Sequence, residues 1–110
     1  MFVATGTGSS PFHSFVQSYP NIDYTLVHGV RFVQEAYDHQ DFETSRIRLC
    51  TSGDDKGHFN GRVSEYLRDQ ALNTKANFFL CGNSEMIYEV FDILGEKGIP
   101  TSNIFSEVYF

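Results

Sequence analysis

Short apolar runs alternate along the chain with longer segments whose apolar residues recur at helical spacing. Five runs have the length and composition of buried strands: residues 2–4, 24–28, 47–50, 77–81 and 104–110. Four segments between them have the periodicity of helices that are apolar on one side: residues 11–18, 31–39, 62–72 and 84–97. The pattern therefore predicts strands and helices in strict alternation.

That alternation predicts the fold class. Successive strands joined by helices form a parallel sheet with helices on both faces. We therefore expect a three-layer α/β/α, Rossmann-like domain with a five-stranded parallel sheet in the order 3-2-1-4-5. The 110 residues are enough for one domain, residues 1–110, and leave no room for a second.

Capping and turn residues indicate where several helices begin and end. Pro11 suits the first turn of the first helix, and Ser84 is a predicted N-cap of the last helix. Gly98 is a predicted C-terminal stop, and Pro100 prevents continuation of the helix. Residues 52–61 are polar and rich in glycine, which predicts a loop.

The turn after the first strand has the composition of an anion-binding loop. It contains Thr5-Gly6-Thr7-Gly8, and glycines let backbone N–H groups approach an anion closely. The turn lacks the third glycine of the dinucleotide fingerprint and the lysine of a P-loop, so taken alone it is weak evidence. In parallel sheets, ligands bind outside the carboxyl ends of the strands, where the strand order reverses. We therefore expect residues 5–10 to form one site with residues 29–31, 52–61 and 82–84.

Composition and charge exclude several classes of function. The net charge of −6 argues against sequence-independent binding of nucleic acid. The apolar runs are too short to cross a bilayer, and no secretory leader opens the chain. Cys50 and Cys81, without such a leader, indicate reduced thiols in a cytoplasmic protein. The histidines and cysteines show no metal-ligand spacing. A strand one residue after Met1 suggests that the chain was cut from a larger protein.

Several short motifs occur together in a recognisable order. They are Ala-Thr-Gly-Thr-Gly-Ser-Ser-Pro-Phe (residues 4–12), His-Gly-Val-Arg (28–31), Gly-Arg-Val (61–63), Cys-Gly-Asn-Ser-Glu-Met (81–86) and Glu-Val-Tyr-Phe (107–110). In this combination the chain closely resembles the pyridine-nucleotide-binding domain of the ferredoxin–NADP reductase family. The resemblance covers essentially the whole chain.

The resemblance implies a function that needs a second domain. Full-length members resemble a two-domain enzyme in which an N-terminal barrel holds FAD and the C-terminal half holds NAD(P). This chain matches the C-terminal half only, and the barrel's Arg-x-Tyr-Ser/Thr flavin motif is absent. We expect it to position nicotinamide for hydride transfer to or from FAD held by a domain in cis. Electrons would pass to ferredoxin, flavodoxin or a similar acceptor, and the isolated chain is expected to be inactive.

The resemblance also assigns roles to single residues. Cys81 would lie beside the reacting carbon of nicotinamide as a positioning group, Glu107 would lie near the reacting atoms, and Tyr109 would stack on the flavin. These three are the predicted catalytic residues. The predicted cofactor-binding residues are Thr5, Gly6, Thr7, Gly8, Pro11, Arg31, Ser52, Arg62, Gly82, Asn83, Met86 and Phe110.

The preference between NAD and NADP stays open. Arg31 and Arg62 are candidates for the adenosine side, because the planar guanidinium suits a 2′-phosphate. NADP-specific relatives commonly carry a Ser-Arg pair after the third strand. Here Ser52 is followed by glycine and then by Asp54 and Asp55, whose carboxylates would repel a 2′-phosphate and favour NADH.

Plainer interpretations of the same residues remain open. The glycine turn also fits an ordinary strand–helix connection, and Cys81 also fits a small buried apolar residue. The arginines also fit solvated surface charges. The alternative function is a stand-alone nucleotide-binding or subunit-docking module without catalysis.

Overall fold

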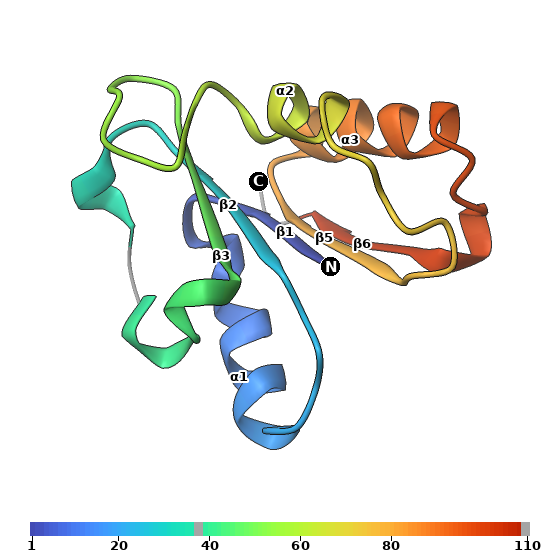
Figure 1. The fold of residues 1–110 in the computed structure, drawn as a ribbon, viewed down its shortest axis with the longest axis horizontal. Helices are drawn as coiled ribbons and strands as arrows, with labels where there is room; N and C mark the ends of the chain where they lie inside the picture. Colours follow the sequence, from blue (N-terminus) through green and yellow to red (C-terminus); the bar gives the residue numbers. More distant parts are fainter. Residues whose placement is uncertain (37–38, 109–110) are drawn as a thin grey trace.

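Six parallel strands form one sheet in the order β4-β3-β2-β1-β5-β6 (Figure 1). This computed structural model describes residues 1–36 and 39–108. The strands are β1 (Phe2–Thr5), β2 (Leu26–Val30), β3 (Ile47–Thr51), β4 (Phe59–Asn60), β5 (Phe78–Gly82) and β6 (Ile104–Val108). The helices are α1 (Ser10–Ser18), α2 (Val63–Arg68) and α3 (Ser84–Glu96). The order of the five expected strands is confirmed.

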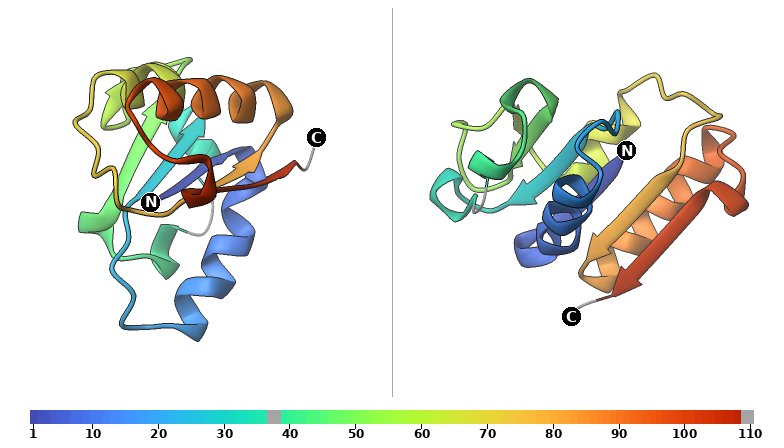
Figure 2. Two further views of the ribbon diagram at one scale, coloured as in Figure 1. Left: turned by 90° about the vertical axis from the view of Figure 1, so that its right-hand side faces the viewer. Right: turned by 90° about the horizontal axis from the view of Figure 1, so that it is seen from below.

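Helices cover both faces of the sheet, as expected for a three-layer domain. Figures 1 and 2 show α1 against one face and α2 with α3 against the other. Side chains of a strand point alternately to the two faces, so each strand contributes to two cores. In β1, Val3 belongs to the core under α2 and α3, whereas Phe2 and Ala4 belong to the core beside α1. In β5, Leu80 belongs to the core under α2 and α3, and Cys81 belongs to the core beside α1.

The expected count of five strands is wrong, because a sixth strand lies at the edge. Strand β4 has two residues and lies inside the loop predicted over residues 52–61. Cys50 pairs with Phe59 and Thr51 with Asn60, both in parallel register. A two-residue strand has no hydrophobic period that sequence analysis would detect. Its consequence is that the end of this loop is fixed against β3.

The α-helix expected over residues 31–39 is also wrong. In its place, the described residues form the 3₁₀ turns Val33–Glu35 and His39–Asp41. Glu35 Oε1 accepts a hydrogen bond from the Phe32 N–H at 2.8 Å, and Asp54 Oδ2 accepts one from the Val33 N–H at 2.9 Å. These carboxylates satisfy the amides that begin the segment, and Ala36 N–H closes an i→i+3 bond to Val33 O.

Two helix ends differ from the predicted ones. Asn83, not Ser84, is the N-cap of α3, and its side-chain oxygen accepts from the Met86 N–H at 2.8 Å. Helix α2 ends at Arg68 rather than at residue 72. Gly98 follows α3 with a φ of +86°, which a helix-terminating glycine adopts readily, so this predicted stop is confirmed.

The core under α3 generates a stability prediction. Leu94 is fully buried, whereas Tyr88 of the same helix is 72% exposed. Leu94→Ala should lower the free energy of unfolding by about 2–5 kcal/mol, because it leaves a cavity in a close-packed core. Tyr88→Ala should change it by less than about 1 kcal/mol. Urea unfolding followed by circular dichroism measures both, and equal losses would show that α3 does not bury Leu94.

Candidate functional site

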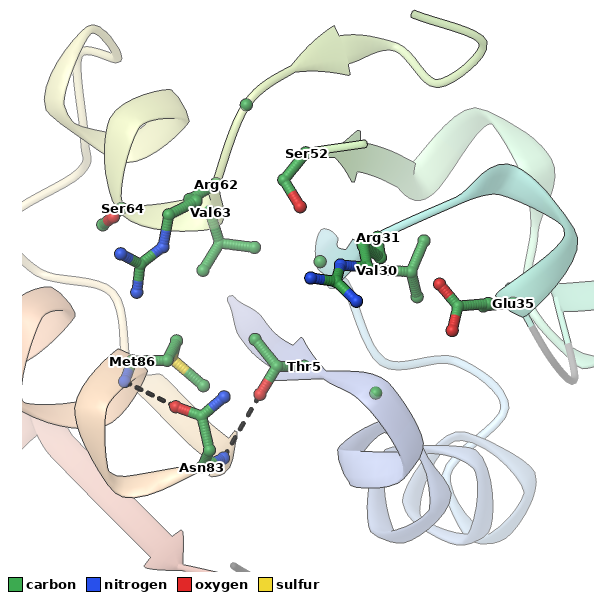
Figure 3. A pocket seen from close by; sticks show the side chains of 13 residues that line it. Thr5, Val30, Arg31, Glu35, Ser52, Arg62, Val63, Ser64, Asn83 and Met86 are labelled. Atoms are coloured by element: carbon green, nitrogen blue, oxygen red, sulfur yellow. Dashed lines mark hydrogen bonds between the residues drawn. The ribbon is translucent and has the colours of Figure 1, made fainter. Parts of the chain in front are cut away.

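One cavity of about 390 Å³ lies at the carboxyl ends of the strands (Figure 3). The loops after β1, β2, β3 and β5 all contribute to its wall, together with the first turns of α2 and α3. It is lined by Thr5, Gly6, Gly29, Val30, Arg31, Glu35, Ser52, Gly61, Arg62, Val63, Ser64, Asn83 and Met86. Its volume lies within the range of small-molecule sites. The expected convergence of loops is thus present.

The ends of β1 and β5 meet at the base of this cavity. The Asn83 N–H donates to Thr5 Oγ1 at 3.2 Å, and both side chains lie on the cavity wall (Figure 3). Gly82 has a φ of +148°, and a Cβ on it would collide with Thr5 Oγ1. Only glycine combines that backbone conformation with so close an approach. Gly82 therefore does not line the cavity but lets its wall form.

A buried histidine is hydrogen-bonded to the glycine turn. His28 is fully buried, and its Nε2 lies 2.7 Å from Gly6 O. Because a carbonyl oxygen only accepts, His28 Nε2 carries the proton of this hydrogen bond. His28 Nδ1 lies 2.8 Å from His39 Nε2, so it accepts from His39 when His28 is neutral. Burial lowers the pKa of His28, and the hydrogen bond to Gly6 opposes that shift.

Two arginines lie on either side of the space above Thr5 (Figure 3). Arg31 follows β2, and Arg62 is the N-cap residue of α2. Arg62 Nη2 lies 2.7 Å from Glu89 Oε1 and 3.8 Å from Glu85 Oε1. The cavity thus has positive groups on two sides, and one of them is already in contact with carboxylates of α3.

Asp54, the first of the two carboxylates in the loop after β3, has a structural role. Asp54 Oδ2 accepts from the Val33 N–H, and its Oδ1 accepts from the Lys56 N–H at 3.0 Å. These hydrogen bonds lower the pKa of Asp54, with the bond from Val33 the largest cause. Asp54 is not among the lining residues, whereas Glu35 is. The carboxylate on the cavity wall is thus one that the sequence analysis missed.

The predicted cofactor-binding residues are brought together in part. The cavity wall includes Thr5, Gly6, Arg31, Ser52, Arg62, Asn83 and Met86. Thr7 and Gly8 follow in the 3₁₀ turn Gly6–Ser9, and Pro11 lies in α1. Phe110 lies outside the described residues.

Two of the predicted catalytic residues, Cys81 and Glu107, are not among the residues that line this cavity. Cys81 is buried beside Phe2 and Phe12 in the core on the α1 side of the sheet. Glu107 is exposed on β6 and is the register partner of Cys81 across the parallel pair. Tyr109 lies outside the described residues. Cys81 and Glu107 are therefore neighbours in the sheet without belonging to the cavity wall.

Six residues of the wall are absent from the list of predicted cofactor-binding residues, although Gly29, Val30 and Gly61 lie in the loops expected to form the site. They are Gly29, Val30, Glu35, Gly61, Val63 and Ser64. Four of these lie within the His-Gly-Val-Arg and Gly-Arg-Val motifs, so the motifs themselves could have indicated them. A Cβ on Gly29 would lie 2.8 Å from Val63 Cγ1, so glycine here lets α2 approach β2. Glu35 was missed because its segment was predicted as a helix.

The cysteines, the possible metal ligands and the helices of the described residues can each be examined for further chemistry. Cys50 and Cys81 are both buried, and burial raises the pKa of Cys50 to about 12. Within residues 1–36 and 39–108, no three His, Cys, Asp or Glu side chains are grouped to hold a metal ion. Over the same residues, no helix has the length and apolar character needed to cross a membrane.

Comparison with known families gives one match over most of the chain. The family model described as the oxidoreductase NAD-binding domain matches residues 2–91. No curated protein matches the chain significantly.

Several solved structures share the fold. Flavohemoglobin from Malassezia yamatoensis, with bound FAD and heme, is 21% identical with a TM-score of 0.81, over 99% of this chain and 31% of that one. The FAD/NAD-binding domain of nitric oxide dioxygenase from Vibrio cholerae O1 biovar El Tor is 16% identical with a TM-score of 0.82, over 98% of this chain and 49% of that one. A variant of ferredoxin-NADP⁺ reductase from Plasmodium falciparum, in complex with 2′P-AMP, is 23% identical with a TM-score of 0.73. The match covers 98% of this chain and 52% of that one. This chain therefore spans about a third to a half of the chains it resembles.

The buried His28 generates a prediction about pH. An unfolded chain protonates this histidine near its ordinary pKa of 6.5, whereas the folded chain keeps it neutral to lower pH. The unfolded state then binds more protons, so stability should fall as the pH drops below 6.5, by at most about 1.4 kcal/mol per pH unit.

Urea unfolding of the wild type and of His28→Gln between pH 5 and 8 measures this contribution. Glutamine retains a donor for Gly6 O but does not titrate, so the wild type should show the steeper loss. Carboxylate contributions are common to both proteins and cancel in the difference. Parallel pH profiles would contradict the assignment of a neutral, buried His28.

Proposed function

Because the chain belongs to the oxidoreductase NAD-binding domain family, we propose that its cavity at the carboxyl ends of the strands binds NAD(P)H. One observation carries this proposal. The loops after β1, β2, β3 and β5 converge on a single cavity of about 390 Å³, whose wall includes Gly6 of the glycine turn and two arginines. That is the place where open parallel sheets bind dinucleotides.

The residues present suit the parts of the dinucleotide. The turn Gly6–Ser9 leads into α1, and we assign the pyrophosphate to Thr5, Gly6, Thr7 and Gly8, with Pro11 in the first turn of the helix. Backbone amides at such a turn favour negative charge. His28 holds the Gly6 carbonyl and so fixes this turn before any ligand enters. Arg31, Ser52 and Arg62 would contact the adenosine side.

We assign the nicotinamide end to the termini of β5 and β6. Asn83 and Met86 bring the first turn of α3 to the cavity, with Gly82 beneath them. Bound NAD(P)H supplies a hydride equivalent at its nicotinamide ring. In this proposal Cys81 positions the ring, Glu107 lies near the reacting atoms, and Tyr109 or Phe110 packs against the second reactant. The register pairing of Cys81 with Glu107 supports a common location for the first two.

The second reactant would come from outside this chain. We propose an FAD-binding domain in cis, with electrons passing onward to ferredoxin, flavodoxin or a similar redox protein in the cytoplasm. Two observations support the separate FAD-binding domain: the chain spans 49% of the Vibrio cholerae FAD/NAD-binding domain and 52% of the Plasmodium falciparum reductase. In this proposal the chain, residues 1–110, supplies only the nucleotide-binding half.

Binding is tested most directly at Arg31. Arg31→Ala should weaken NADH and NADPH binding by about tenfold, because it removes a positive group from the cavity wall. Arg68→Ala is the matched control, since Arg68 is exposed at the end of α2 and does not line the cavity. Quenching or enhancement of reduced-nicotinamide fluorescence on titration measures both. Equal affinities for the two variants would refute the assigned cavity.

The need for a flavin gives a second test. The purified, flavin-free chain should reduce no ferricyanide or tetrazolium dye with NADH or NADPH, while still binding either nucleotide. Dye reduction is followed by absorbance, and nucleotide binding by fluorescence of the same sample. Turnover by flavin-free protein would show that this chain carries its own redox chemistry.

A further inference from the structure

Arg62 is engaged by acidic side chains of a helix distant in sequence. Its Nη2 donates to Glu89 Oε1 at 2.7 Å, and Glu85 Oε1 lies 3.8 Å from the same nitrogen. Glu85 and Glu89 are four residues apart on α3, so they lie on one side of that helix. Helix α3 thereby presents two carboxylates to one arginine of the cavity wall.

The arrangement leaves the arginine in contact with both solvent and the cavity. The side chain of Arg62 is 46% exposed, that of Glu89 is 34% exposed, and that of Glu85 is 76% exposed. Arg62 lines the cavity, but neither glutamate does. An anion entering the cavity would therefore meet a guanidinium whose outer nitrogen already has a carboxylate partner.

We propose that Glu89, aided by Glu85, is a specificity-determining residue that weakens binding of a 2′-phosphate at Arg62. The inference rests on the proposed function, because it takes the adenosine end of NAD(P)H to lie at this arginine. NADPH carries an additional phosphate at this end, where NADH has a hydroxyl. The glutamate pair weakens binding of the NADPH phosphate and leaves binding of the NADH hydroxyl almost unaffected.

The charges explain this selectivity. A phosphate binds arginine best through two parallel hydrogen bonds to the planar guanidinium. To make them, it must displace Glu89 from Nη2 or share the group with it, and it then lies beside two negative carboxylates. A neutral ribose hydroxyl needs one hydrogen bond and meets no such repulsion. Asp54, by contrast, already accepts hydrogen bonds from two backbone amides.

Glu89→Gln isolates the charge. Glutamine keeps an oxygen that accepts from Arg62 Nη2 but removes the negative charge. We expect NADPH and 2′-phospho-AMP to bind about three- to tenfold more tightly, with NADH and AMP changed by less than about twofold. The gain should shrink in 0.5 M NaCl, because salt screens exposed charges. Glu96→Gln removes the same charge from the exposed end of α3 and should change none of these affinities.

Isothermal titration calorimetry with the four nucleotides separates the possible results. Tighter binding of only the two 2′-phosphorylated ligands supports the inference. An equal gain for all four ligands, no gain, or weaker NADPH binding would overturn it, the last showing that Glu89 positions Arg62. If the wild type binds none of the four, the proposed function itself fails, which distinguishes the two ideas.

Discussion

The close approach of β1 and β5 at their carboxyl ends is the constraint on which the site depends. Thr5 Oγ1 accepts a hydrogen bond from the Asn83 N–H. The two strands can come this close only because Gly82 has no Cβ, which would collide with Thr5 Oγ1. The strand order also reverses here, since β2 and β3 extend the sheet from β1 in one direction and β6 extends it from β5 in the other. The loops that leave β1 and β5 therefore diverge above a shared base. A crevice at this point follows from the topology, and the glycine determines how closely its walls meet.

Buried or tethered polar groups hold the surrounding loops, and most of them are not ligand groups themselves. His28 donates to Gly6 O from beneath the glycine turn. Asp54 joins the loop after β3 to the segment after β2 through the Val33 amide. Glu35 satisfies the Phe32 amide in that same segment while its side chain lines the cavity. These bonds fix the loop conformations without a ligand, so less ordering entropy opposes binding.

The sequence predicts the sheet well because its information is local and periodic. Each of the five longer strands is a short apolar run, and their alternation with helical segments predicts that they pair in parallel. The 3₁₀ turns near Glu35 were not predictable, because they depend on Asp54, about twenty residues away along the chain. Strand β4 is too short for any pattern, and Asn83 competes with Ser84 as a cap of similar chemistry. The loops of the site were predicted from the topology, whereas Glu35 was hidden by an incorrect helix assignment.

Charge selectivity illustrates the same limit of sequence reasoning. Arg62 is readily identified from its motif, and the sequence predicts that Asp54 and Asp55 oppose a 2′-phosphate because they lie near Ser52. The folded chain changes the assignment: Asp54 is bound to backbone amides, and Glu89, 27 residues from Arg62, makes the contact instead. The effective charge of an arginine in a site depends on the carboxylates that folding brings to it. A count of basic and acidic residues in the adjacent loops does not reveal this contact, because it depends on the packing of α3 beside α2.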